Sequence, residues 1–263
     1  MTSAPPTPDR LFPAPGDRAP SPHRATLARS VRLLTAFRRE HTDPAYFYEL
    51  MARDTVAQLG SYTVLPGATV IDVGTGSGFF ARALAEAGGQ CVGIDRDPAE
   101  LTAHGAAAPN TLVGSALALP FRTGSFDVCF SSNVLEHVPE PWRMADEMLR
   151  VVRPGGTVFL SFTNWLSPWG GHETSPWHYL GGDRAARRYE RRHGRPPKNL
   201  YGESLHPVSV SAALRWARGR DDAHFVAAVP RYHPRWAGWI VRVPGVREFA
   251  TWNLVLVLRK KAA

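Results

Sequence analysis

Three glycines at alternate positions constrain this chain more than any other part of its sequence. They lie in residues 74–78 (Gly-Thr-Gly-Ser-Gly), between the apolar run 70–73 and residues 79–87, which are mostly good helix formers. The run is rich in β-branched residues and predicts a buried strand of a parallel sheet. The glycines let the backbone approach a ligand closely. A second apolar run, 91–94, ends at Asp95, so the stretch predicts one βαβ unit of a nucleotide-binding sheet.

The acid that ends the second strand indicates the kind of ligand. A carboxylate there can accept hydrogen bonds from both hydroxyls of a ribose, whereas it would repel a phosphate. A dinucleotide site needs the spacing G-x-G-x-x-G, and Phe79 stands where its third glycine would be. Asp72, at the end of the first strand, suits a cationic group such as an ammonium or a sulfonium. We therefore expect a positively charged nucleoside between Asp72 and Asp95, and the glycine spacing disfavours a nicotinamide-dependent reductase.

Further motifs follow the glycine loop in a fixed order. They are residues 119–121 (Leu-Pro-Phe), 125–127 (Ser-Phe-Asp), 135–138 (Leu-Glu-His-Val) and 150–156 (Arg-Val-Val-Arg-Pro-Gly-Gly). Together with the acid and the glycines before them, these motifs resemble the class I S-adenosylmethionine-dependent methyltransferases. Within that family, the chain is most similar to the small-molecule branch that contains methyltransferase domain 11, and to its actinobacterial members. The resemblance implies an α/β enzyme that uses S-adenosylmethionine. It also implies a Rossmann-like, seven-stranded, mostly parallel sheet with an antiparallel last strand and helices on both faces.

The resemblance also implies where the cofactor binds. Ligands of doubly wound sheets bind at the carboxyl ends of the strands, so residues 74–78 should face the end of the predicted fourth strand, 126–132. The family often has an acid after the third strand, where this chain has Ser115; its hydroxyl, or the backbone of Ala116, can take that place. The predicted cofactor-binding residues are Asp72, Gly74, Thr75, Gly76, Gly78, Asp95, Arg96, Ser115, Ala116, Ser132 and Asn133.

Three histidines are candidate catalytic residues. A hydroxyl or ammonium acceptor must lose a proton, so a base that titrates near neutrality helps methyl transfer. His137 follows the fourth strand, where the methyl group should point; helix capping or support of a neighbour is its alternative role. His172 and His178 are further candidates. We expect no metal, because residues 131–133 (Ser-Ser-Asn) replace the acids that bind a divalent ion in some related O-methyltransferases, and the spacing of the histidines matches no metal motif.

Two helices and a tail are predicted ahead of the glycine loop. Residues 1–24 contain seven prolines and almost no apolar pattern, which predicts a disordered tail before a single domain, 25–263. Within the N-terminal helices, 25–60, the first has an apolar face with its arginines elsewhere on the surface. The second begins at Asp43-Pro44, a good N-cap followed by proline. Such helices fold over the cofactor in the family, so the aromatic residues 46–48 either line the site or belong to the core.

The long segment 164–206 has no regular pattern and is interpreted as a lid or acceptor pocket. Four large aromatic residues in its first half argue against disorder, and a basic run follows at 184–198. Aromatic walls suit a sugar, polyketide or lipid, and arginines suit a phosphate or carboxylate. We expect the methyl group to be transferred to an oxygen atom of a small molecule: a secondary metabolite, a sugar or an envelope lipid.

Composition limits where such a protein works. A hydrophobic content of 44% and a charged content of 21% are ordinary for a globular protein. No charged-then-apolar leader opens the sequence, and no apolar run approaches the length of a membrane span. Cys91 and Cys129 both fall in predicted core strands, which suggests free thiols in a reducing compartment. We expect a cytoplasmic protein.

The net charge of +8 leaves several alternatives open. An RNA methyltransferase that uses the basic run 184–198 would explain it, but no RNA-binding module is recognisable and nucleic acid is not an expected partner. Trp236, Trp239, Ile240 and Val243 form an apolar helical face. That face either packs in the core or, with neighbouring arginines, contacts an anionic membrane from the cytoplasmic side. A non-catalytic partner protein that binds the cofactor is the remaining alternative.

Overall fold

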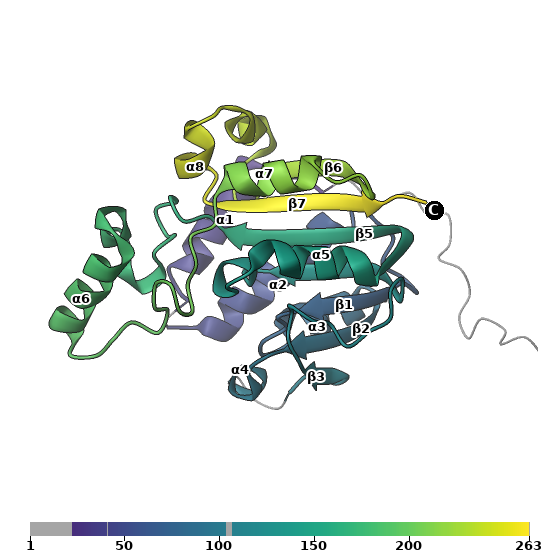
Figure 1. The fold of residues 1–263 in the computed structure, drawn as a ribbon, viewed down its shortest axis with the longest axis horizontal. Coiled ribbons are helices and arrows are strands. Elements are labelled where there is room, and N and C mark those ends of the chain that lie inside the picture. Colours follow the sequence, from purple (N-terminus) through teal and green to yellow (C-terminus); the bar gives the residue numbers. More distant parts are fainter. Residues whose placement is uncertain (1–22, 41, 104–106, 263) are drawn as a thin grey trace, which may run out of the picture.

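The computed structural model describes residues 23–40, 42–103 and 107–262. Their centre is a seven-stranded sheet with the strand order β3-β2-β1-β4-β5-β7-β6 (Figure 1). The predicted disordered tail lies outside the described residues except for its last two. The strands are β1 (Thr69–Val73), β2 (Gln90–Asp95), β3 (Thr111–Val113), β4 (Phe126–Ser132), β5 (Val152–Thr163), β6 (Ala223–Pro230) and β7 (Asn253–Lys260).

The strand directions confirm the predicted fold class. β1 pairs in parallel with β2 on one side and β4 on the other, and only β7 runs antiparallel to its neighbours. The chain order reverses between β1 and β4, which makes the loop after β1 the switch point where doubly wound sheets bind ligands. β5 begins at Val152 and includes residues 154–156 (Pro-Gly-Gly), although these residue types are typical of turns.

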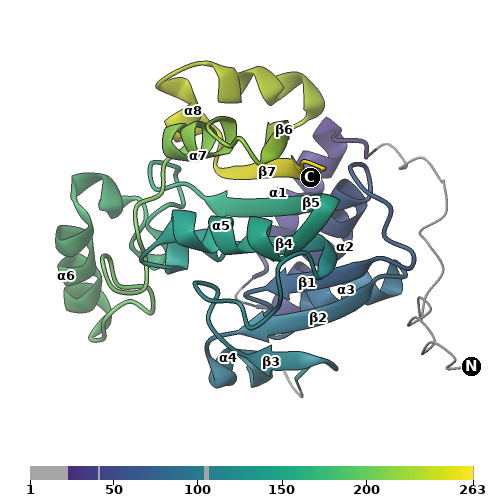
Figure 2. The ribbon, with the colours of Figure 1, turned by 45° about the vertical axis from the view of Figure 1, so that its right-hand side comes forward.

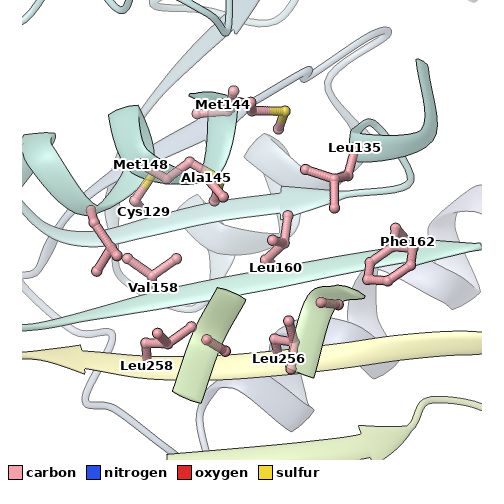
Figure 3. Close-up of a cluster of buried hydrophobic side chains, with 14 of the residues drawn as sticks. Cys129, Leu135, Met144, Ala145, Met148, Val158, Leu160, Phe162, Leu256 and Leu258 are labelled. Atoms are coloured by element: carbon pink, nitrogen blue, oxygen red, sulfur yellow. The ribbon is translucent and has the colours of Figure 1, made fainter. Parts of the chain in front are cut away.

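Helices cover both faces of the sheet, because successive strand residues point to opposite sides. On one face, α5 (Pro141–Val151) and α7 (Val210–Arg218) bury a cluster that includes Met148, Val158 and Leu256 (Figure 3). On the other, α2 (Pro44–Leu59) and α3 (Phe79–Glu86) pack on the alternate strand residues. Each large apolar side chain buried in these clusters contributes about 1.5–3 kcal/mol. The two layers hold the strand ends, and therefore the loops that follow them, in fixed positions.

The first helix, α1 (Leu27–Phe37), faces the opposite way from the sequence-based prediction. Arg29 is only 6% exposed, whereas Leu27 and Val31 of the apolar face are 60% and 55% exposed. The Arg29 guanidinium donates two hydrogen bonds to the Asp54 carboxylate, at 2.8 and 2.6 Å, and a third to the Arg231 carbonyl. Burial alone would raise the pKa of Asp54, but hydrogen bonds from His23 and Arg29 lower it to about 2. A fully paired guanidinium can be buried, so the apolar face is left on the outside.

The segment after β5 is more regular than predicted. It contains η2 (His172–Thr174), η3 (Trp177–Leu180) and α6 (Gly182–His193), which includes much of the basic run. α6 has no apolar periodicity to reveal it, yet Gly194 ends it in the left-handed conformation that favours glycine. Basic residues in its last turn interact favourably with the helix dipole. Both ribbon views show α6 standing to the side of the sheet, beyond the carboxyl end of β5 (Figures 1 and 2).

The predicted apolar helical face at residues 236–243 is wrong in its period. Residues 235–242 form the 3₁₀ helix η4 (Arg235–Arg242), in which side chains three apart eclipse one another. Trp236 and Trp239 therefore share one row and are 71% and 51% exposed, while Ile240 is buried. The remaining short helices are α4 (Pro98–Thr102), η1 (Leu135–His137) and α8 (Val246–Ala250). Among the described residues, no helix combines the length and apolar character that crossing a bilayer requires.

Candidate functional site

A cavity of about 1850 Å³ opens at the carboxyl ends of β1 and β4. The glycine loop and the end of β2 line one end; α1, η4 and the segment after β5 line the other. Small-molecule pockets are commonly about 300–1,000 Å³. This cavity therefore has room for a nucleoside and a second molecule beside it.

The glycine loop holds the Asp95 carboxylate against the cavity. Asp95 Oδ2 accepts a hydrogen bond from the Gly76 amide at 2.9 Å, and its Oδ1 accepts one from the Asp97 amide at 3.0 Å. Gly74 has φ 76°, and a Cβ there would lie 2.2 Å from the Val134 side chain. Only glycine fits this approach between the loop and the segment after β4. Each Asp95 oxygen keeps a lone pair for a further donor such as a ribose hydroxyl.

Asp72 lies beneath the loop and does not line the cavity, which corrects its predicted contact with the cationic group. The side chain is buried and accepts a hydrogen bond from Thr75 Oγ1 at 2.7 Å. Desolvation, with a smaller contribution from the Asp95 charge, raises the pKa of Asp72 to about 7 in spite of that hydrogen bond. Gly78 is also absent from the cavity wall: it caps α3 with φ 74°, and a Cβ there would meet Ala108. Asp72 and Gly78 therefore support the glycine loop without lining the cavity.

The other predicted cofactor residues do come together around the cavity. The hydroxyl of Ser115 accepts a hydrogen bond from the Leu117 amide at 3.2 Å and keeps a second lone pair. The predicted residues that line the cavity are Gly74, Thr75, Gly76, Asp95, Arg96, Ser115, Ala116, Ser132 and Asn133.

A buried arginine that the sequence did not reveal orients the β4 end of this wall. Arg231 follows β6, is 1% exposed, and donates to Ser132 Oγ at 2.9 Å and to Thr55 Oγ1 at 2.5 Å. Asn133 has φ 58°, and its Oδ1 accepts a hydrogen bond from Asn253 at 2.7 Å. Arg231 belongs to no motif, and its partners come from three distant parts of the chain, so no local signal could have identified it.

His137 and His172 meet beside the cavity, with the buried Glu136 behind them. The two rings lie 5.0 Å apart at 75°, and both line the cavity. His137 Nδ1 is 2.7 Å from the Ser204 carbonyl oxygen. Because a carbonyl can only accept, Nδ1 carries the proton and Nε2 is left as an acceptor. Burial lowers the pKa of His172, although the nearby Glu136 charge opposes that shift, so the His172 ring is neutral at pH 7.

The predicted catalytic role of His178 is not supported by its position. The residue is 1% exposed and does not line the cavity. Its Nε2 lies 3.1 Å from the Ser167 carbonyl oxygen and its Nδ1 lies 3.4 Å from Ser175 Oγ. Both ring nitrogens therefore serve the packing of the segment after β5.

Aromatic contacts connect that segment to the rest of the cavity wall. The Trp169 ring lies edge-on to Phe37 of α1 at 5.8 Å and to Trp252, just before β7, at 4.8 Å. Of the aromatic residues 46–48, Phe47 and Tyr48 line the cavity and Tyr46 does not. No residue of α6 lines it. Within residues 164–206, the first half and the residues near 200 thus form part of the cavity wall. The arginines of α6 do not line the cavity.

Comparisons with known proteins agree with this geometry. The pattern of the family described as "Methyltransferase domain" matches residues 71–160. An uncharacterised methyltransferase of Mycobacteroides abscessus is 53% identical over 251 residues, which cover 90% of this chain and 96% of that protein. One from Mycobacterium tuberculosis is 53% identical over 245 residues, covering 89% and 96%. The structure of an S-adenosylmethionine-dependent methyltransferase from Mesorhizobium loti shares the fold: its TM-score is 0.54 at 18% identity, over 81% of this chain and 98% of that one.

Proposed function

Because this chain belongs to the class I S-adenosylmethionine-dependent methyltransferases, we propose that it methylates a hydroxyl group of a small, largely apolar molecule. One observation carries the choice of acceptor: a single cavity runs from the glycine loop to an outer end lined by apolar side chains of α1 and η4. Leu27, Val31 and Trp236 belong to that outer end and are exposed. An envelope lipid or an apolar secondary metabolite fits such a wall better than a free sugar does.

The residues around the glycine loop fit the cofactor. S-adenosylmethionine supplies an activated methyl group, whose transfer to the acceptor oxygen breaks the methyl–sulfur bond and leaves that electron pair on sulfur. Asp95 would accept the ribose hydroxyls, and the loop lets the backbone lie against the nucleoside. Holding donor and acceptor in line is worth up to about 7–11 kcal/mol of the barrier. Trp169 packs against Phe37 of α1, and these side chains would limit the access of water to the methyl group.

The acceptor hydroxyl must also lose its proton. His137 and His172 line the cavity in which the acceptor would bind. His137 Nδ1 faces the Ser204 carbonyl, which leaves Nε2 as the nitrogen that can take a proton, and burial lowers the pKa of His172. An imidazole in its neutral form can take a proton from a hydroxyl group. We therefore assign the activation of the acceptor to this cluster and not to His178.

The outer end of the cavity also suits a membrane surface. Trp236 and Trp239 are exposed side by side on η4, with Arg235 and Arg242 at the two ends of that helix. Tryptophan and arginine together are typical of monotopic contact with anionic lipid. An apolar acceptor could then enter the cavity directly from the lipid.

The experiment that tests the function has two steps. Calorimetry should first show that S-adenosylmethionine and S-adenosylhomocysteine bind the purified protein. Tritiated S-adenosylmethionine is then incubated with organic and aqueous extracts of mycobacterial cells and with total RNA. We expect protein-dependent label in the organic extract that resists mild alkaline hydrolysis, because methylation of a hydroxyl group forms an ether. Label in RNA alone would replace this proposal with the RNA alternative, and label in the aqueous extract alone would refute an apolar acceptor.

A further inference from the structure

We propose that Glu136, His137 and His172 form a binding site for a divalent transition-metal ion, with Zn²⁺ as its best match. One ligand atom from each of the three lies within 4.8 Å of the other two. In a tetrahedral site, zinc–nitrogen and zinc–oxygen bonds of about 2.0–2.2 Å hold two ligand atoms about 3.3–3.6 Å apart. A small inward movement of the three groups would therefore complete the site.

The first argument is that two buried polar atoms here have nothing to bind. Glu136 Oε2 and His172 Nε2 are inaccessible to solvent and have no hydrogen-bond partner among the described residues. Leaving a buried polar atom unpaired destabilises the folded protein, and more so when the group is charged. A cation between the carboxylate and the imidazole would satisfy both atoms at once.

The second argument is that the other atoms of these groups are held as a metal site requires. The proton on His137 Nδ1 is directed to the Ser204 carbonyl at 2.7 Å, which presents the unprotonated Nε2 as a ligand. Glu136 Oε1 accepts the Thr163 amide at 2.9 Å, which orients the carboxylate. Metal-binding imidazoles and carboxylates commonly have such outer hydrogen bonds.

The third argument is the position of the cluster. His137 and His172 line the cavity, whereas Glu136 is 1% exposed behind them. Three protein ligands with the remaining positions open toward a ligand cavity are typical of catalytic rather than structural metal sites. The role of the ion rests on the proposed function and would replace proton abstraction by the imidazoles: the ion would bind the acceptor oxygen and lower the pKa of its hydroxyl, and the released proton would pass to solvent.

The ligand types select the metal class. Two imidazoles and one carboxylate favour zinc and its neighbours over magnesium or calcium, which prefer oxygen ligands. No metal was expected from the sequence, because residues 131–133, which precede Glu136, contain no acids. His172 is brought in from the segment after β5, and no spacing rule links it to Glu136 and His137.

Metal binding is tested without any methyl-transfer assay. Protein free of a histidine tag is stripped with chelator and titrated with Zn²⁺ by calorimetry and with Co²⁺ by visible absorption, with Mg²⁺ as a comparison. We expect one equivalent of Zn²⁺ or Co²⁺ to bind, and Mg²⁺ to bind at least tenfold more weakly. His172→Ala and Glu136→Gln should each weaken binding at least about tenfold. Glu136→Gln keeps an oxygen for the Thr163 amide, and thermal unfolding of each metal-free variant checks that it is folded.

His193→Ala is the matched control, because His193 is an exposed histidine of the same segment, on α6. Its zinc affinity should equal that of the wild type. Absence of stoichiometric binding, or equal binding by His172→Ala, would refute the site and leave a water-bridged general base. If zinc fails to bind while methyl transfer to the organic extract persists in chelator, only this inference is lost. If zinc binds and no extract accepts label, only the proposed function is lost.

Discussion

The two ends of the cavity are built in different ways. At the cofactor end, the glycine loop, Asp95 and Ser115 follow consecutive strands, and backbone hydrogen bonds hold them in place. At the acceptor end, α1, η4 and Trp169 come from three distant parts of the chain: Trp169 packs on Phe37 of α1, and the Arg235 amide of η4 donates a hydrogen bond to the Ala25 carbonyl just before α1. The cofactor end is polar and tightly fitted, whereas the acceptor end is aromatic, apolar and partly exposed. A site of this kind can keep one chemistry while the molecule that receives the methyl group changes.

The largest effect should come from a methyl group added within the glycine loop. Gly74→Ala puts a Cβ 2.2 Å from Val134 at φ 76°, whereas Gly194→Ala, at φ 68° on α6, meets no atom within 4 Å. Both variants incur the left-handed cost of about 1–2 kcal/mol. Only Gly74→Ala adds an overpacking cost of about 1–3 kcal/mol. Urea unfolding should separate them by that amount; equal losses would mean that the loop is no more tightly fitted than α6.

The next largest effect concerns cofactor affinity. Asp95→Ala removes the acceptor for the ribose hydroxyls, and two charge-assisted hydrogen bonds contribute at least about 3 kcal/mol together. The dissociation constant for S-adenosylhomocysteine should therefore rise about 100-fold in calorimetry. Glu173→Gln changes an acid that lines the acceptor end and should shift the constant less than twofold. A similar loss in both variants would contradict the division of the cavity.

The raised pKa of Asp72 predicts an unusual pH dependence of stability in the cofactor-free protein. The carboxyl has a pKa near 4 when unfolded and about 7 when folded. Between these values the folded state holds a proton that the unfolded state has released. The free energy of unfolding should therefore fall as the pH rises from 4 to 7, by at most about 1.4 kcal/mol per unit, and should level off above 7. Asp72→Asn should remove this slope, and Asp183→Asn, on α6, should keep it; urea unfolding from pH 5 to 8 measures both.

The smallest effect on the fold should come from the exposed tryptophans. Trp236→Ser combined with Trp239→Ser should change stability by no more than about 0.5 kcal/mol, because both side chains are on the surface. Cofactor affinity should not change. Flotation with anionic vesicles at low salt should fall several-fold, whereas Phe225→Ser, which changes an exposed aromatic on the edge strand β6, should float as the wild type does. Equal flotation of all three proteins would rule out the membrane contact.

The two ends also differ in how far sequence patterns can predict them. The bounds of β4 agree with residues 126–132 expected from the sequence, because an apolar run is a local signal. The glycine loop and Asp95 were equally predictable. The outward face of α1 was not, because burial of Arg29 depends on Asp54 and on Arg231, which is 202 residues away. The Glu136–His137–His172 cluster and the eclipsed tryptophans of η4 likewise depend on tertiary packing that no periodicity encodes.

The burial of Arg29 divides α1 into two sides with different freedom to diverge. Its inner side is tied to a carboxylate that is itself buried, so replacing the arginine alone would strand that charge, and a neutral pair would need two simultaneous changes. Its outer side, with Leu27, Val31 and Leu34, faces the cavity and solvent. Descendants of this protein can therefore exchange the outer residues one at a time and explore new acceptors, while the inner residues preserve the scaffold on which that exploration occurs.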